Sequence, residues 1–181
     1  GGTRRLMLPA GQAGAQMQDD TIRFATSEIA PAFGRPEQGT ASPSVYTVWP
    51  IYETLTRVSE TGDVSGLLAT SWKNIDNTTW QFTIRRGVKF QNGDTLTAHH
   101  VASQINYLLS NEEAHGTVAY STNQRQAKMN SARAIDDYTV EFTTEVANPE
   151  LPRQMAGFWI PNTNVRDDIG TEAHNKAPVG T

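Results

Sequence analysis

Adjacent histidines and adjacent aspartates are the residues of this chain whose types could do chemistry. His99 and His100 are neighbours, and on a helix their side chains would point about 100° apart, whereas gripping one metal ion requires i and i+4 spacing. His115 and His174 have no Cys or acidic cluster at metal-ligand spacing around them. The sequence therefore predicts no metal site and no cofactor.

Paired carboxylates could act as general acid and base only if they faced one cleft. Asp136-Asp137 and Asp167-Asp168 are the two pairs, and the first stands in a predicted turn, where Asp is expected for its backbone hydrogen bonds. The chain contains no Gly-x-Ser-x-Gly elbow and no glycine-rich phosphate loop. We therefore expect no enzyme, and a β-rich hydrolase is the weakest alternative.

A basic pair, Arg85-Arg86, precedes Gly87 at the end of a predicted strand. An arginine there could hold a peptide carboxylate by a forked contact. We favour the alternative that Arg85 pairs with an acidic residue on an adjacent strand, such as Glu141.

Composition limits the class of protein. The chain has 181 residues, 37% of them hydrophobic, which is enough for one folded domain and marginal for two. Its net charge of −4 offers no basic face for nucleic acid or an anionic membrane. It has no Cys, so neither a disulfide framework nor a thiolate metal site is expected, and no apolar run reaches the roughly 18 residues of a membrane span.

The elements that would position any site centre on residues 79–109. Trp80, Phe82 and Ile84 alternate with polar residues, which predicts a half-buried strand over 79–84. Asn92-Gly93 predicts a turn, and Thr97 is a predicted N-cap of a helix. That helix has one apolar stripe, formed by Ala98, Val101, Ala102, Ile105, Leu108 and Leu109.

The flanking segments supply further predicted elements. Hairpins are expected for 56–59 with 64–69, for the strands that carry Trp72 and Trp80, and for 132–135 with 138–144. The two tryptophans should lie close together, more as core than as a ligand platform. We also expect a first strand over 21–26, a surface loop over 27–44 and a helix over 45–55 that Pro50 kinks or starts. A surface excursion with at most a short helix is expected over 110–130, and a short helix opened by Asn148-Pro149 follows.

The string SWKNIDNTTWQFTIRRGVKFQNGDTLTAHHVASQINYLL resembles the signature of the family 5 extracellular solute-binding proteins, the peptide, oligopeptide and nickel binders of ABC importers. AIDDYTVEFTT and APVGT resemble two further family segments, and the resemblance covers 21–181. The chain departs from the pattern at Gln91-Asn92, where the family usually has His-Asp, and at His99-His100, which replace an acidic pair at the helix start. Both departures fall at turns or caps, so they bear on local capping more than on membership.

The resemblance implies an α+β, periplasmic-binding-protein-like fold with a small mixed or antiparallel sheet and packed helices. It divides the chain into a leader or disordered arm (1–20), the first strand of lobe one (21–44), an accessory subdomain (about 45–175) and a return to lobe one (176–181). Family members continue well beyond APVGT, so we expect an N-terminal fragment without the second lobe, whether natural or cut.

The resemblance also implies a function and a site. It implies a periplasmic, exported component that captures a peptide-like solute, an oligopeptide or dipeptide, for an ABC transporter permease. Ser27, Glu28 and Ile29 would line the ligand site, and Tyr120 could reach into the cleft. From the residues alone, Glu28 could equally be a solvated loop carboxylate. The alternative function is a stand-alone structural or interaction module without ligand binding, and a truncated chain would bare apolar surface and self-associate.

Overall fold

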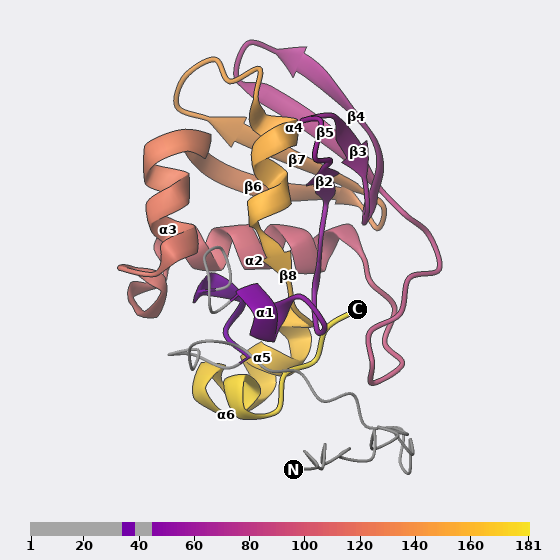
Figure 1. The fold of residues 1–181 in the computed structure, drawn as a ribbon, viewed down its shortest axis with the longest axis vertical. Coiled ribbons are helices and arrows are strands. Elements are labelled where there is room, and N and C mark those ends of the chain that lie inside the picture. The colour runs from indigo at the N-terminus through magenta and orange to yellow at the C-terminus, as the bar shows by residue number, and fades with distance from the viewer. Residues whose placement is uncertain (1–33, 39–44) are drawn as a thin grey trace, which may run out of the picture.

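The computed structural model describes residues 34–38 and 45–181, and the fold is built around a four-stranded sheet (Figure 1). The sheet has the order β4-β5-β7-β6, in which β4 is Ala69–Asp76, β5 is Thr79–Ile84, β6 is Met129–Asp136 and β7 is Thr139–Thr144. Every pairing in it is antiparallel. The predicted α+β class with a small antiparallel sheet is therefore confirmed.

Alternation along β5 decides which face of the sheet is buried. Phe82 and Ile84 are buried, and Phe82 meets Phe142 of β7 edge to face, with ring centroids 5.3 Å apart. Trp72 lies opposite Phe82 and Trp80 lies opposite Asn74, so the two indoles flank the Phe82 ring instead of facing each other. Both tryptophans are partly buried against the core, as the core interpretation expected.

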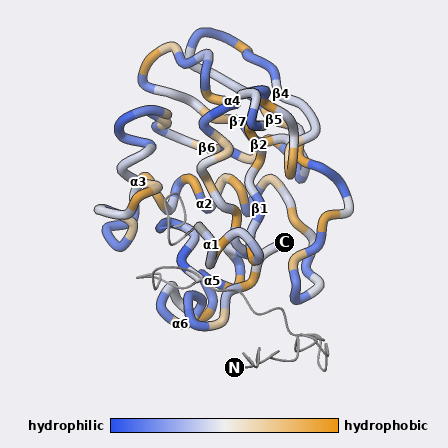
Figure 2. The backbone as a smooth tube through the Cα atoms, viewed as in Figure 1, coloured by the Kyte–Doolittle hydropathy of each residue, from blue (hydrophilic) through white to orange (hydrophobic). Residues whose placement is uncertain are grey.

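Helix α2 (Ala98–Ser110) covers the buried face of the sheet, mainly over β6 and β7. In Figure 2, hydrophobic residues gather along α2 and the neighbouring strands, while much of β4 is hydrophilic. The predicted stripe is confirmed, because Ala98, Val101, Ala102, Ile105 and Leu108 are buried and Leu109 is partly buried against the core.

Thr97 is the N-cap of α2, as predicted, and His100 explains one departure from the family pattern. The Thr97 backbone N–H donates to His100 Nδ1 at 3.2 Å, the contact that an acidic or amide side chain at this third helical position makes in a capping box. The imidazole thus replaces a carboxylate as the acceptor. Because Nδ1 accepts, the proton of neutral His100 lies on Nε2.

Shorter elements surround this core. They are η1 (Pro36–Gln38), α1 (Val45–Val48), β1 (Glu53–Thr54), β2 (Thr56–Val58), β3 (Val64–Gly66), η2 (Glu112–Ala114), α3 (Val118–Thr122), the π-helical η3 (Asn123–Ala127), α4 (Leu151–Gln154), η4 (Met155–Gly157), β8 (Trp159–Ile160), α5 (Thr163–Ile169) and α6 (Thr171–Lys176). β1 pairs with β8, and β2 pairs with β3 across the predicted turn.

Three predictions about elements were wrong. The helix expected over 45–55 ends at Val48, because Pro50 cannot continue it and the chain turns into β1. The short helix begins at Leu151, with Pro152 in its first turn, and not at Asn148-Pro149. The segment 110–130 was expected to hold at most a short helix at the surface, but it contains η2, α3 and η3, and its Ala114, Ala119 and Ala127 pack into the core. The strand expected over 21–26 lies outside the described residues.

Candidate functional site

Of the four predicted ligand-binding residues, the structure describes one. Ser27, Glu28 and Ile29 lie outside the described residues. Tyr120 is half-buried in α3, and its ring centroid is 4.6 Å from that of His115. Helix α3 packs against η1, so Tyr120 belongs to an element that contacts the segment following Ile29 in the sequence. Its predicted role stays a prediction.

An open hollow of about 540 Å³ lies between α1, β1, β2 and the chain around β8; we call it the aromatic groove. It is lined by Trp49, Tyr52, Glu53, Thr54, Thr56, Arg57, Val58, Leu67, Ala156 and Trp159. Two indoles, hydroxyl groups, one carboxylate and one guanidinium therefore share one surface. Sequence reasoning did not single out this set.

The turn after α1 builds one wall of the groove. The backbone N–H groups of Ile51 and Tyr52 both donate to the Val48 carbonyl, at 3.0 and 2.9 Å, and this turn leaves Trp49 67% exposed. Tyr52 also lines the groove but is buried, and its hydroxyl donates to the Gly34 carbonyl at 2.9 Å. Pairing of β1 with β8 places Trp159 opposite Thr54 and so supplies the facing wall.

Gly180, in the APVGT segment, packs directly against the backbone of this turn. A Cβ at Gly180 would lie 1.8 Å from the Ile51 carbonyl oxygen, so only glycine fits there. The segment is also fixed by two hydrogen bonds, from the Gln91 N–H to the Gly180 oxygen at 2.9 Å and from the Gly180 N–H to Gln91 Oε1 at 2.8 Å. Gln91, one of the departures from the family pattern, therefore anchors the APVGT segment to the turn that precedes α2.

The aromatic groove can bind but offers no catalytic set. Indole faces attract cations and flat apolar groups, whereas Glu53 and Arg57 can pair with groups of either charge. Such a mixture suits a ligand that carries both charges and an apolar body. Within residues 34–38 and 45–181, no group of three or more His, Cys, Asp or Glu side chains could hold a metal ion.

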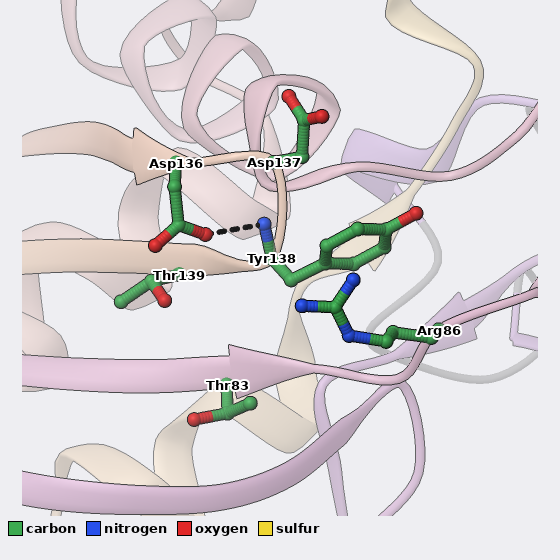
Figure 3. Close-up of a pocket in the computed structure, with 6 residues that line it drawn as sticks. All are labelled: Thr83, Arg86, Asp136, Asp137, Tyr138 and Thr139. Carbon is green, nitrogen blue, oxygen red and sulfur yellow. Dashed lines mark hydrogen bonds between the residues drawn. The ribbon is translucent and has the colours of Figure 1, made fainter.

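A second hollow, of about 320 Å³, lies at the end of the sheet (Figure 3). Arg86 lies over the Tyr138 ring, with its guanidinium carbon 4.0 Å from the centroid. The Tyr138 N–H donates to Asp136 Oδ1 at 2.8 Å, and hydrogen bonds from this turn hold the pKa of Asp136 below its ordinary value. The carboxylates of Asp136 and Asp137 point apart in Figure 3, which agrees with the structural role predicted for this pair.

The predicted pairing of Arg85 with Glu141 is wrong. Glu141 instead accepts from Arg133 at 2.8 Å and from Gln81 at 2.9 Å. Both partners stand directly opposite Glu141 in the sheet, whereas the β5–β7 ladder ends at Thr83, before Arg85 is reached. These two hydrogen bonds hold the pKa of Glu141 below its ordinary value.

A buried polar cluster beside the middle of α2 was also missed. Glu37 and Arg166 are each only 3% exposed, although charged residues are rarely fully buried unless paired. Arg166 donates to Gln104 Oε1 and lies over the Tyr107 ring at 4.2 Å. No sequence signal marks this set, since Glu37 stands in a Pro- and Gly-rich segment and Arg166 in a polar helix with Asp167 and Asp168 beside it.

The four-stranded antiparallel sheet under one helix has the fold found in periplasmic binding proteins. Residues 63–181, more than half of the chain, match the model of the bacterial extracellular solute-binding proteins, family 5 Middle. The chain belongs to this family. Two of its relatives are named as binding proteins.

Two curated relatives are from Escherichia coli (strain K12). The nickel-binding periplasmic protein is 30% identical over 142 residues, which cover 72% of this chain and 25% of the relative. The periplasmic murein peptide-binding protein MppA is 31% identical over 91 residues, covering 50% of this chain and 16% of the relative. This chain thus spans a quarter or less of the length of both relatives.

Among solved structures, the oligopeptide-binding protein AppA from Bacillus subtilis in complex with a nonapeptide is similar. The TM-score is 0.71 at 22% identity, over 83% of this chain and 30% of that one. At this identity the likeness shows the fold. In the part of the chain that the structure describes, no helix is long and apolar enough to cross a membrane.

Proposed function

We propose that these residues are the N-terminal part of an extracytoplasmic solute-binding component of an ABC importer, which captures a peptide-like solute between two lobes. The observation that carries the proposal is the family match over 63–181 together with the aromatic groove. A peptide has charged termini, amides and side chains of mixed polarity. The aromatic groove offers a partner for each of these groups through the side chains of Trp49, Trp159, Glu53 and Arg57.

Binding would act through lobe closure. A ligand that makes contacts with both lobes favours the closed state by the difference in its affinity for the two states. In this proposal Ser27, Glu28, Ile29 and Tyr120 contact the solute from the first lobe. The proposal includes a permease partner and a periplasmic location, and the names of two relatives as periplasmic proteins support the location.

The first test is the gene sequence that follows Thr181. We expect Gly-Pro-Tyr and a long continuation that encodes a second lobe. A stop codon directly after Thr181 would contradict the two-lobe proposal.

The second test is calorimetry with a pool of tetrapeptides. It is run on the longer protein that the continued gene would encode, called the extended protein, and on the 181-residue chain. The extended protein should bind with micromolar or tighter affinity, whereas the 181 residues alone should give no heat because contacts from the second lobe are missing. Nickel with L-histidine serves as a comparison ligand, since a nickel-binding relative is among the similar proteins. Binding of the nickel complex but no peptide would refute a peptide-like solute.

A second candidate function, a self-associating interaction module, is favoured by one observation. Trp49, Tyr46 and Val58 are exposed large hydrophobic residues in or next to the aromatic groove. Light scattering of the 181-residue chain at high concentration tests it: a dimer or larger species that Trp49→Ser disrupts supports the module, and a strictly monomeric chain excludes it.

A further inference from the structure

Two residues of the APVGT segment, Val179 and Gly180, have a hydrogen-bond partner for each of their four backbone polar groups. The Val179 N–H donates to His174 Nε2 at 3.3 Å, and the Val179 carbonyl accepts from the Asn162 N–H at 2.9 Å. The Gly180 N–H donates to Gln91 Oε1, and its carbonyl accepts from the Gln91 N–H. We call these four hydrogen bonds the anchor. Of the three partners, only His174 can change from acceptor to donor, because its imidazole titrates near neutral pH.

His174 lies in α6 and is almost completely buried. It is 1% exposed, and its ring stacks on that of Tyr52, with ring centroids 6.5 Å apart and ring planes inclined by 22°. Because Nε2 accepts from Val179, the proton of neutral His174 lies on Nδ1, whereas that of His100 lies on Nε2. The two buried histidines therefore have opposite tautomers.

The surroundings of His174 favour its neutral form. Burial, and after it the charge of Arg166, lowers the pKa of His174 below its ordinary value of 6.5. Arg166 and Asp167 of α5 pair with each other, as do two exposed residues of α6. The charged and titratable groups on α6 and around the His174 and Tyr52 rings are Arg166, Asp167, Tyr52, Glu37, Glu172 and Lys176.

Protonation of His174 is incompatible with its hydrogen bond to the backbone. An imidazolium carries a proton on both nitrogens, so Nε2 would become a donor facing the Val179 N–H, which is also a donor. A buried donor without an acceptor destabilises the local structure. The other three hydrogen bonds of the anchor do not change with pH in this range, because backbone groups and the Gln91 amide do not titrate.

His174 and the anchor support one wall of the aromatic groove. Gly180 packs against the Ile51 carbonyl, and the His174 ring stacks on Tyr52. Tyr52 lines the groove, and Ile51 belongs to the turn that also exposes Trp49. His174 is not among the lining residues, so its effect on a ligand in the groove passes through these two contacts.

We propose that neutral His174 is a positioning residue, which fixes Val179 and Gly180 against the wall of the aromatic groove and releases them in acid. The release itself depends only on contacts among described residues. Its effect on a bound solute rests on the proposed function.

The direction of the pH effect follows from the lowered pKa. When the segment opens, His174 reaches water and takes up a proton at its ordinary pKa of 6.5, whereas the closed form resists protonation down to a lower pH. The anchor is therefore at full strength above about pH 6.5. Below this pH the opening equilibrium constant rises about tenfold for each pH unit, until the pKa of the closed form is reached.

The test is amide hydrogen exchange of Val179 and Gly180 in the 181-residue chain, followed by NMR and corrected for the intrinsic exchange rate. Protection of these amides should fall at least about tenfold from about pH 7 to about pH 5. His115→Phe is the matched control and should keep this fall, because it removes a histidine that also lies against a tyrosine ring but is exposed. A protection profile that is flat in the unmodified chain would overturn the proposal.

Two variants of His174 separate titration from packing. His174→Gln carries an acceptor that does not titrate, so protection near neutral pH should be kept and should no longer fall in acid. His174→Phe keeps an aromatic ring without an acceptor, so protection should be lower at every pH and equally flat. If His174→Phe does not fold, His174→Gln decides the question. The same fall in either variant as in the unmodified chain would refute the assignment to His174.

The imidazole tautomer is a readout that loss of packing alone would not move. Proton–nitrogen correlation spectra of the histidine rings at neutral pH should place the proton of His174 on Nδ1 and that of His100 on Nε2. A neutral His174 protonated on Nε2 would contradict the hydrogen bond on which the anchor depends.

The solute arm separates the anchor from the function. In the extended protein, a tetrapeptide that needs the closed wall should raise protection of Val179 and Gly180 by about 100-fold at a free concentration of about 100 times its Kd. Peptide binding without any change in this protection would refute the link between the anchor and the groove. If the extended protein binds no peptide, the proposed function fails, while the pH profile of the 181-residue chain still decides the role of His174.

Discussion

Two arginines of this protein lie over tyrosine rings at almost the same distance but in opposite surroundings. Arg166 is 4.2 Å from the Tyr107 centroid and buried, with Gln104, Ser103 and Asp167 as hydrogen-bond partners. Arg86 is 4.0 Å from the Tyr138 centroid and exposed at the end of the sheet. The same pair of side chains thus occurs once inside the fold and once at its surface.

The difference shows that burial, and not the contact itself, determines how much an arginine over a tyrosine ring stabilises the fold. A cation over an aromatic ring contributes about 0.5–1 kcal/mol in water but about 2 kcal/mol or more when it is desolvated. A buried charge must also be offset by partners, because removing one leaves the other uncompensated. We therefore expect Arg166 to tie elements together and Arg86 to be dispensable.

Replacing Arg166 by Met should have the largest effect on stability. A hydrogen bond to a charged group contributes about 1.5–3 kcal/mol, and the variant loses those to Gln104 and Ser103 together with the cation over the Tyr107 ring. Urea denaturation followed by tryptophan fluorescence measures the change in the free energy of unfolding. A loss below about 1 kcal/mol, the level of an exposed ion pair, would show that the cluster is not held by charge.

The two tyrosines offer the next contrast. Tyr107→Leu should cost about 2 kcal/mol, because it removes the ring from a desolvated guanidinium, whereas Tyr138→Leu should cost about 0.5–1 kcal/mol. The same denaturation experiment compares them directly. Equal losses would remove the distinction between the two regions.

Glu37 should give the buried cluster a pH signature. Its pKa is raised in the folded state from an ordinary value of 4.5, so the folded protein holds this proton more tightly than the unfolded chain does. Stability from this group is therefore present below pH 4.5 and is lost as the pH rises through the folded pKa, at about 1.4 kcal/mol for each pH unit between the unfolded and folded pKa values. Glu37→Gln should flatten this fall in thermal unfolding measured from pH 4.5 upward, and an identical slope in both proteins would contradict the assignment.

Arg86→Met should have the smallest effect, about 0.5–1 kcal/mol. Since the guanidinium is exposed, even this contribution should shrink with added salt. Unfolding at about 50 mM and about 500 mM NaCl, on either side of physiological ionic strength, measures both effects. A loss as large as that of Arg166→Met would mean that exposure does not separate the two arginines.

Periodicity predicted those parts of the fold in which neighbours along the chain decide the outcome. The strand over 79–84, the helix that Thr97 starts and the hairpin at Asp136-Asp137 are all present, because alternation and helical spacing specify which face is buried. The helix expected over 45–55 ends at Val48, because Pro50 has no N–H to continue the helical hydrogen bonds even though the apolar residues keep helical spacing.

The candidate site was less predictable for a physical reason. Trp49, Glu53 and Trp159 meet only because β1 pairs with β8, a strand far along the chain. No local spacing encodes that pairing. Arg85 and Glu141 were expected to meet because both lie on polar strand faces, but the register pairs Glu141 with Arg133 and Gln81.

The family and the sheet under its helix could be predicted from the amino-acid sequence alone, because both depend on side-chain types at short, regular spacing. Only the tertiary structure decides which charges are buried and which polar groups share a surface. Glu37 and Arg166 look like ordinary solvated residues in the sequence. Both become buried because α3 and β8 pack against η1 and because Arg166 of α5 donates to Gln104 of α2, and the free energy of a charge depends on what surrounds it in space.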